Sequence, residues 1–137
     1  MRLPIDDFLP KISASLKQHP NVVISAAPGA GKTTRVPVEL ARHSQKQVWV
    51  LEPRRIAAVS AAHRISEENN WSVGNEVGYQ VRFDAKMSST TQILFLTEAL
   101  LLRKLKSDPE LSQVGVVVLD EFHERSLHVD LALACLK

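Results

Sequence analysis

Short runs of apolar residues alternate along this chain with longer segments whose apolar residues recur at helical spacing. Apolar runs predict buried strands at 21–25, where the run is Val22 to Ile24, and at 48–51, 93–96 and 114–119. The alternation from Val77 to Phe83 predicts a half-buried strand. Helical spacing marks the segments 5–18, 31–43, 54–69, 98–106 and 125–136. Strands that alternate with helices in this way predict a three-layer α/β domain with a mainly parallel sheet.

Several single residues refine this prediction. Pro10 predicts a break in the first helix, and Pro37 predicts a bend in the second, because proline cannot donate a hydrogen bond to the preceding turn. Thr97 is a suitable N-cap for the helix 98–106. Three aromatic residues are expected to pack in the core or at the sheet edge: Trp49, Trp71 and Tyr79.

Composition supports one ordinary globular domain. The chain has 137 residues, of which 45% are hydrophobic and 23% charged, and its net charge is only +2. The one cysteine, Cys135, is expected to be a buried thiol. An acidic pair near the start and the lack of long apolar runs argue against a secretory signal or a membrane span, so a cytoplasmic location and no membrane partner are expected.

The segment AAPGAGKTT, from Ala26 to Thr34, follows an apolar run and opens a helical one, as a phosphate-binding loop does. Its small residues let successive backbone N–H groups point at one phosphate. Lys32 adds a positive charge, and Thr33 offers a hydroxyl to Mg²⁺. The usual pattern begins with glycine, whereas this one begins with Ala26; an ordinary glycine-rich turn is the alternative. The segment predicts a nucleoside triphosphate as ligand.

A second group of polar residues follows the apolar run 116–119. Asp120 leaves the predicted strand with a carboxylate that can hold hydrated Mg²⁺, and Glu121 could polarise the attacking water. An acidic helix start favoured by the helix dipole is the alternative. His123 could sense the γ-phosphate or link the nucleotide site to another element, and a helix cap or surface group is the alternative for it. The phosphate-binding segment and the acidic group each follow a predicted parallel strand, so both are expected at the edge where the strands have their carboxyl ends. Ligands of parallel sheets bind at that edge.

The order of motifs gives a specific resemblance. AAPGAGKTT, LEPRRIAA (51–58), VGYQVRF (77–83), TEALLLR (97–103) and DEFHER (120–125) follow one another as in the DEAH-box helicases, and the DEFHER form is similar to the bacterial HrpB-type members. The chain resembles the first RecA-like domain of such an ATP-dependent helicase. The resemblance implies ATP and Mg²⁺ as ligands, and an RNA or DNA strand, with RNA expected, as partner.

The resemblance also implies roles for individual residues. Catalytic roles fall to Lys32, Asp120, Glu121 and His123, and metal binding to Thr33 and Asp120. Nucleotide binding falls to the phosphate loop and to an arginine that matches a base-stacking position: Pro28, Gly29, Ala30, Gly31, Lys32, Thr33, Thr34 and Arg64. Contacts with the nucleic-acid backbone fall to Arg54, Arg55, Arg82 and Thr97, of which Arg82 could instead form an internal salt bridge.

The resemblance further predicts what this chain lacks. DEAH-box helicases place ATP between two RecA-like domains, and residues 1–137 match a single, incomplete N-terminal one. The match stops before the Ser-Ala-Thr strand, which lies inside the sheet of the family. We therefore expect little hydrolysis and no unwinding by this chain alone, and exposed sheet edges that favour self-association.

Two other functions stay open at this point. The chain could be a non-catalytic module that binds nucleic acid through Arg54 and Arg55. It could also be a different phosphate-loop enzyme, such as a small kinase, although the PRR segment and the histidine of DEFH argue against that class.

Overall fold

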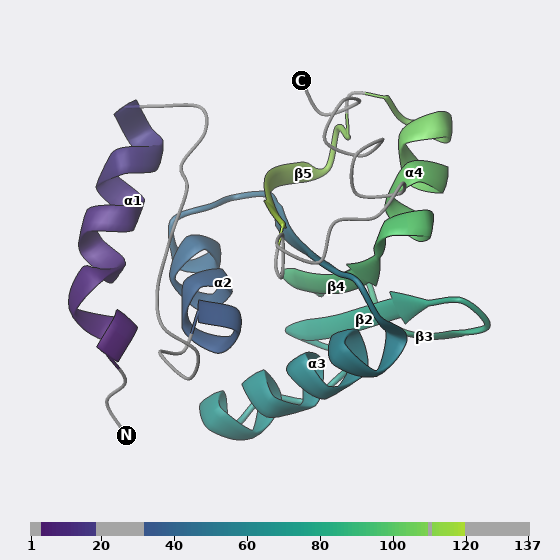
Figure 1. Cartoon of the computed structure of the whole chain (residues 1–137), viewed down its shortest axis with the longest axis horizontal. Coiled ribbons are helices and arrows are strands. Elements are labelled where there is room, and N and C mark those ends of the chain that lie inside the picture. The colour runs from purple at the N-terminus through teal and green to yellow at the C-terminus, as the bar shows by residue number, and fades with distance from the viewer. Residues whose placement is uncertain (1–3, 19–31, 110, 120–137) are drawn as a thin grey trace.

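A computed structural model describes residues 4–18, 32–109 and 111–119 (Figure 1). The elements in this part of the chain are η1 (Pro4–Phe8), α1 (Leu9–Gln18), α2 (Lys32–Arg42), β1 (Gln47–Glu52), α3 (Arg55–Asn69), β2 (Val77–Val81), β3 (Asp84–Lys86), β4 (Ile93–Thr97), α4 (Glu98–Ser107) and β5 (Val114–Leu119). The predicted elements 31–43, 48–51, 54–69, 93–96, 98–106 and 114–119 are confirmed to within a residue at each end. The predicted strand 21–25 and helix 125–136 lie outside the described residues.

The described strands form one sheet in the order β3-β2-β4-β1-β5. All neighbouring pairs are parallel except β2 with β3, so the predicted, mainly parallel sheet is confirmed. Strands β1 and β4 lie at its centre, which explains their unbroken apolar sequences: each is paired on both sides and buried on both faces.

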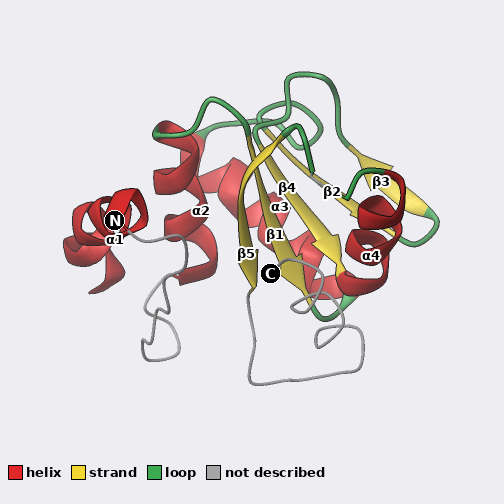
Figure 2. Ribbon diagram, turned by 90° about the horizontal axis from the view of Figure 1, so that it is seen from above, coloured by secondary structure: helices red, strands yellow, loops and turns green. Residues whose placement is uncertain are grey.

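Two hydrophobic clusters cover the two faces of the sheet. Val48 and Val50 of β1 pack into one cluster with residues of α1, α2 and α3, whereas Trp49 and Leu51 pack into the other with α4. Neighbouring residues of a strand point to opposite faces, so the two clusters lie on opposite sides of the sheet. Helices on both sides of a sheet are the three-layer arrangement predicted from the sequence. Figure 2 shows α2 and α3 on one side of the sheet and α4 on the other.

Helix α3 lies close to the sheet because small residues line its buried side. Ala58 and Ala62 are fully buried, Ala61 is nearly so, and α3 contacts β1, β2 and β4. In the first helical segment, the predicted break falls between Phe8 and Leu9. Pro10 is therefore in the first turn of α1, where its missing N–H costs nothing.

Two expectations about strands are wrong in part. The predicted strand 77–83 ends at Val81, and Phe83 is 87% exposed with a φ of 68°, because the chain turns there into β3. Residues of β5 are half-buried or exposed, although its sequence predicts a buried strand. Within the described residues β5 pairs only with β1, so one of its edges has no neighbouring strand there.

Candidate nucleotide and nucleic-acid site

The carboxyl ends of three adjacent parallel strands lie at one edge of the sheet. Glu52 of β1 is in register with Thr97 of β4, and Leu51 with Leu119 of β5. The acidic residues Asp120 and Glu121 come next in the sequence after Leu119, but they and His123 lie outside the described residues. The end of β5 is thus level with the ends of β1 and β4, as the predicted site requires.

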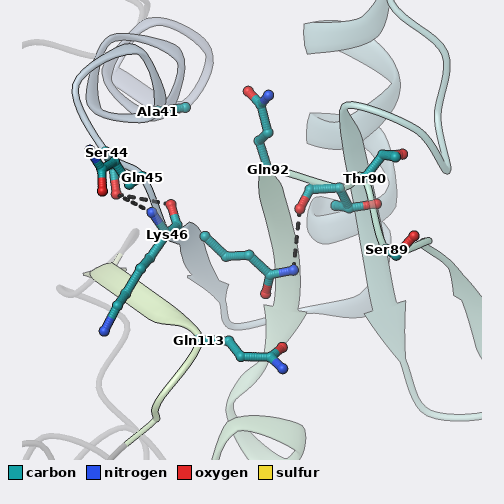
Figure 3. A pocket seen from close by; sticks show the side chains of 10 residues that line it. Ala41, Ser44, Gln45, Lys46, Ser89, Thr90, Gln92 and Gln113 are labelled. Carbon is teal, nitrogen blue, oxygen red and sulfur yellow. Dashed lines mark hydrogen bonds between the residues drawn. The ribbon is translucent and has the colours of Figure 1, made fainter.

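Helix α2 begins near this same edge. Ala41, in its last turn, lines one cavity together with three glutamines (Figure 3). Gln47 begins β1, and Gln92 and Gln113 directly precede β4 and β5. The last turn of α2 therefore lies at the opposite edge, where these strands begin. An 11-residue helix is about 16 Å long, close to the length of a six-residue strand, so the first residue of α2, Lys32, starts toward the carboxyl ends.

The described part of the phosphate loop contains one feature that fits a polar ligand. Thr34 is 5% exposed, and its Oγ1 has no hydrogen-bond partner. Buried hydroxyls are nearly always paired, so this atom suits a ligand that accepts or donates a hydrogen bond. Thr33 is half-buried, and the side chain of Lys32 lies outside the described residues, as do Pro28, Gly29, Ala30 and Gly31.

Arginine side chains follow the ends of neighbouring strands. Arg54 is the N-cap of α3, Arg55 is its first residue, and both are exposed two or three residues after β1 ends. Arg54 has extended backbone angles and caps the helix without a side-chain hydrogen bond. Two cations at a helix N-terminus oppose the helix dipole, so this position favours an anion from outside.

Arg82 and Thr97 continue this row along the edge. Thr97 ends β4 and is the N-cap of α4, as predicted, although its side chain makes no capping hydrogen bond. Arg82 directly follows the last residue of β2, which pairs with β4, and therefore lies in the turn after the strand, although the sequence predicts that the strand continues to Phe83. Its guanidinium carbon lies 4.8 Å from the centre of the Phe83 ring. With strands about 4.8 Å apart, positions after β1, β4 and β2 form a row about 10 Å long.

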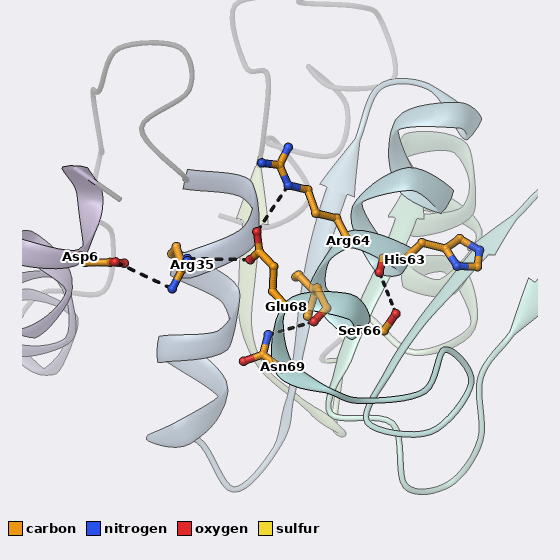
Figure 4. A network of polar contacts seen from close by, with 8 residues as sticks. Asp6, Arg35, His63, Arg64, Ser66, Glu68 and Asn69 are labelled. Carbon is orange, nitrogen blue, oxygen red and sulfur yellow. Dashed lines mark hydrogen bonds and ion pairs between the residues drawn. The ribbon is translucent and has the colours of Figure 1, made fainter. Parts of the chain in front are cut away.

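Arg64 lies apart from this row, on α3. It pairs with Glu68 one turn later, with 3.5 Å between the Arg64 Nε and Glu68 Oε1 atoms (Figure 4). The other carboxylate oxygen of Glu68 is 3.8 Å from Nε of Arg35, in the first turn of α2. The residue proposed for base stacking therefore lies next to the helix that follows the phosphate loop.

Buried carboxylates at the sheet edge were not predicted as site residues. Glu52 is the last residue of β1 and Glu98 the first of α4, and both are almost inaccessible. Both make polar contacts in the structure. The only sign of a buried carboxylate in the sequence is that Glu52 directly follows the apolar run 48–51. A glutamate at that position is equally typical of a strand that ends in solvent.

Comparison with known proteins identifies the family. The sequence matches the family model of DEAD/DEAH box helicases over residues 9–129. The chain belongs to the DEAD/DEAH box helicase family. It is 45% identical to the ATP-dependent RNA helicase HrpB of Escherichia coli (strain K12) over 98% of this chain and 17% of that protein. It is 42% identical to the probable ATP-dependent RNA helicase DHX34 of Homo sapiens, over 98% of this chain and 12% of that protein.

Solved structures agree with this helicase assignment. A crystal structure of Escherichia coli DEAH/RHA helicase HrpB superimposes with a TM-score of 0.93 at 45% identity, covering 98% of this chain and 17% of that one. The predicted RecA-like α/β fold is confirmed by this likeness. The helicase chain spans about a sixth or less of the length of these relatives.

Two cavities lined by described residues of the helicase chain bear on the site. The cavity of about 410 Å³ at the amino ends of the strands is on the wrong edge for the phosphate loop. The cavity of about 210 Å³ runs along α2 from Thr34 to Arg42, and its wall includes Arg35 and Glu68. No described helix is long and apolar enough to cross a membrane, and no described cluster of His, Cys, Asp and Glu residues could hold a metal ion.

Proposed function

We propose that this chain is the ATP-binding part of an ATP-dependent RNA helicase, in which hydrolysis of Mg-ATP drives movement along a nucleic-acid strand. The observation that carries the proposal is the common edge: the PRR segment, Thr97 and the end of β5 lie on one side of the sheet, and α2, which directly follows the phosphate loop in the sequence, starts toward that side. Membership of the helicase family and the likeness to HrpB, an ATP-dependent RNA helicase, support ATP and RNA as ligands.

The proposed nucleotide site has distinct parts. Backbone N–H groups of Gly29, Ala30 and Gly31, after Pro28, cradle the phosphates, and Lys32 places its ammonium against the outer ones. The unpaired hydroxyl of Thr34 supports this assignment, since it has hydrogen-bonding capacity that the described residues leave unused. Arg64 stacks on the base, which gives weak base selectivity because stacking contacts a π-face.

Thr33 and Asp120 are the residues that would hold Mg²⁺, with hydroxyl and carboxylate oxygens that suit a hard cation. When bound, the ion neutralises charge on the phosphate oxygens. Glu121 orients the attacking water and accepts its proton, and His123 links the nucleotide site to neighbouring elements. In this proposal a second RecA-like domain supplies arginine charge worth about 10³ to 10⁵ in turnover, so this chain alone hydrolyses ATP slowly.

The proposed nucleic-acid site is the row of positions after β1, β4 and β2. Arg54, Arg55 and Arg82 contact phosphates, and Thr97 adds a hydroxyl contact between them. Phosphate contacts carry no base information, so binding is independent of sequence. The exposure of all three arginines supports this assignment.

The test of the proposal is a calorimetric titration with Mg-ATP. Lys32→Ala should weaken binding by at least about tenfold, because a charge-assisted phosphate contact is lost. Lys46→Ala is the matched control: Lys46 is exposed and lies at the opposite edge of the sheet, so its loss should leave binding unchanged. Equal ATP affinity in the wild type and Lys32→Ala would reject the nucleotide site.

The row of exposed arginines also favours a second candidate, a nucleic-acid-binding module without turnover. For both candidates, Arg54→Ala should lower the salt dependence of single-stranded RNA binding by about 0.7 in log–log slope. Arg103→Ala, on the exposed side of α4, is the control and should leave the slope unchanged. RNA-stimulated ATP hydrolysis would exclude the module, whereas RNA binding without any ATP binding would favour it.

A further inference from the structure

Glu68 lies between two arginines that come from different helices. Its Oε1 is 3.5 Å from Nε of Arg64 on the same helix, and its Oε2 is 3.8 Å from Nε of Arg35 on α2. Arg35 in turn has a second carboxylate partner, because its terminal nitrogen is 3.8 Å from Oδ2 of Asp6 in η1. Figure 4 shows these side chains pointing toward one another across the space between η1, α2 and α3.

The exposed fractions of these side chains show which end of the network meets solvent. Glu68, Arg35 and Asp6 are 25%, 27% and 18% exposed, whereas Arg64 is 65% exposed. The inner members are thus packed among three elements, and the outermost arginine is accessible. Because Arg35 holds one oxygen of the Glu68 carboxylate, the other oxygen can restrict the motion of the long, exposed Arg64 side chain.

The geometry at Arg64 leaves the guanidinium able to stack. Glu68 approaches Nε, an atom whose N–H bond lies in the guanidinium plane. A partner at that position orients the plane and does not cover its two faces, which are the surfaces that stack on a ring. Pairing with Glu68 and stacking on a base are therefore compatible.

The same network connects Arg64 to the first turn of α2, the helix that follows the phosphate loop in the sequence. Arg35 directly follows Thr34, and Thr34, Arg35 and Glu68 line one cavity of about 210 Å³. The Arg35 to Glu68 pair thereby holds the last turns of α3 against the first turn of α2. A base contact made by Arg64 is then fixed relative to the phosphates that the loop binds.

We propose that Glu68 is a positioning residue that orients Arg64 for contact with the nucleobase and is itself anchored by Arg35. This inference rests on the proposed nucleotide site and adds the group that places its base contact. It assigns Glu68 no contact with the nucleotide and no part in the chemistry.

The experiment compares two ligands, Mg-ATP and Mg-tripolyphosphate, which share a chain of three phosphates while only the first has a base. Glu68→Gln keeps the shape of the side chain and removes its charge. It should weaken ATP binding by about two- to fivefold, the range that corresponds to an exposed arginine–carboxylate pair, and leave tripolyphosphate binding unchanged. Glu67→Gln, the same change at an exposed neighbouring residue, should alter neither affinity.

A double-mutant cycle identifies the pathway of the effect. Arg64→Ala should weaken ATP binding alone, and Arg64→Ala with Glu68→Gln should bind ATP no more weakly than Arg64→Ala, because Glu68 acts through Arg64. Equal weakening of ATP and tripolyphosphate by Glu68→Gln would overturn the proposal in favour of a purely structural role. Unchanged or tighter ATP binding would overturn it too, since Glu68 would then be irrelevant or would sequester Arg64.

Failure of the underlying nucleotide site would give a different result. In that case the wild type would bind neither ligand, or Lys32→Ala would leave both affinities as they are. Thermal unfolding of each variant accompanies the titrations. Because Arg64 is exposed, Arg64→Ala is expected to fold, and an ATP affinity unchanged in that variant would by itself overturn the inference.

Discussion

Replacement of Gly78 by alanine tests how tightly the β2–β3 hairpin, whose turn contains Arg82, is packed. An added Cβ would lie 2.4 Å from the carbonyl oxygen of Lys86 and 3.3 Å from Cα of Met87. Both are backbone atoms: Lys86 is the last residue of β3, and Met87 follows it. Strand β3 pairs with β2, with Lys86 opposite Tyr79. The hairpin strand must therefore move by about an ångström before ordinary van der Waals contact is restored.

The size of the effect follows from two opposing terms. Overpacking against rigid backbone costs about 1 to 3 kcal/mol. The lower entropy of alanine in the unfolded chain returns about 0.5 to 1 kcal/mol. The net prediction is a loss of about 0.5 to 2 kcal/mol in the free energy of unfolding, or a fall of about 2 to 8 °C in Tm.

Thermal and urea unfolding of Gly78→Ala and Gly115→Ala measure this difference. Gly115 is the matched control, a strand glycine whose added Cβ would meet the Ser44 hydroxyl at 2.6 Å and the Lys46 Cβ at 3.3 Å. The nearest atom is the end of a half-buried side chain, hydrogen-bonded to the backbone of Lys46, and it can move more easily than the backbone of β3. The change at Gly115 should therefore stay within about 1 kcal/mol. A Gly78→Ala variant as stable as the wild type, or less affected than Gly115→Ala, would refute this account of the hairpin.

Three further predictions concern the core and the site. Leu101→Ala, at a fully buried position of α4, should lower the free energy of unfolding by about 2 to 5 kcal/mol in urea titrations; a loss under about 1 kcal/mol would mean that α4 does not cover the sheet as described. Thr34→Val should leave stability unchanged or raise it, because the hydroxyl has no partner to lose, while Mg-ATP affinity falls; marked destabilisation in thermal unfolding would contradict the unpaired hydroxyl. Burial raises the pKa of Tyr79 above its ordinary value of 10.0, aided by the hydrogen bond that its hydroxyl donates to Asp84 and by the charge of that carboxylate. The folded phenol thus keeps its proton where the unfolded one loses it, so the stability from Tyr79 is present below about pH 10 and is lost as pH rises through the folded pKa. Tyr79→Phe should therefore lose less stability than the wild type between neutral pH and pH values above 10, and parallel pH curves for the two proteins would contradict this assignment.

The central fold could be predicted from the sequence because its strands are buried on both faces. In β1 and β4 every apolar residue packs into one of two clusters, so an unbroken apolar run is the direct consequence of the fold. The hairpin could not be predicted in this way. Alternation continues through Arg82 and Phe83 in the sequence, but a positive φ at Phe83 turns the chain before the pattern ends. Apolar content alone also could not reveal that β5 has only one described neighbour.

For the candidate site, the sequence predicted the edge of the sheet but not the contacts across it. Parallel topology brings the carboxyl ends of β1, β4 and β5 together, and this is the edge at which the motifs predict the site. The pairing of Glu68 with Arg35 depends on how α3 lies against α2, which no local pattern encodes. Burial of Glu52 and Glu98 likewise depends on what covers the edge, and a glutamate at the end of an apolar run gives no sign of it.

The most direct test of the proposed site is the ATP affinity of the wild type and of Asp120→Asn, each measured with and without Mg²⁺. In this site the carboxylate after β5 and the phosphate loop before α2 meet on one metal-bound triphosphate. We therefore predict that Mg²⁺ strengthens ATP binding to the wild type and that most of this gain disappears in Asp120→Asn, while binding without Mg²⁺ does not weaken. The same gain from Mg²⁺ in both proteins would contradict the proposed site.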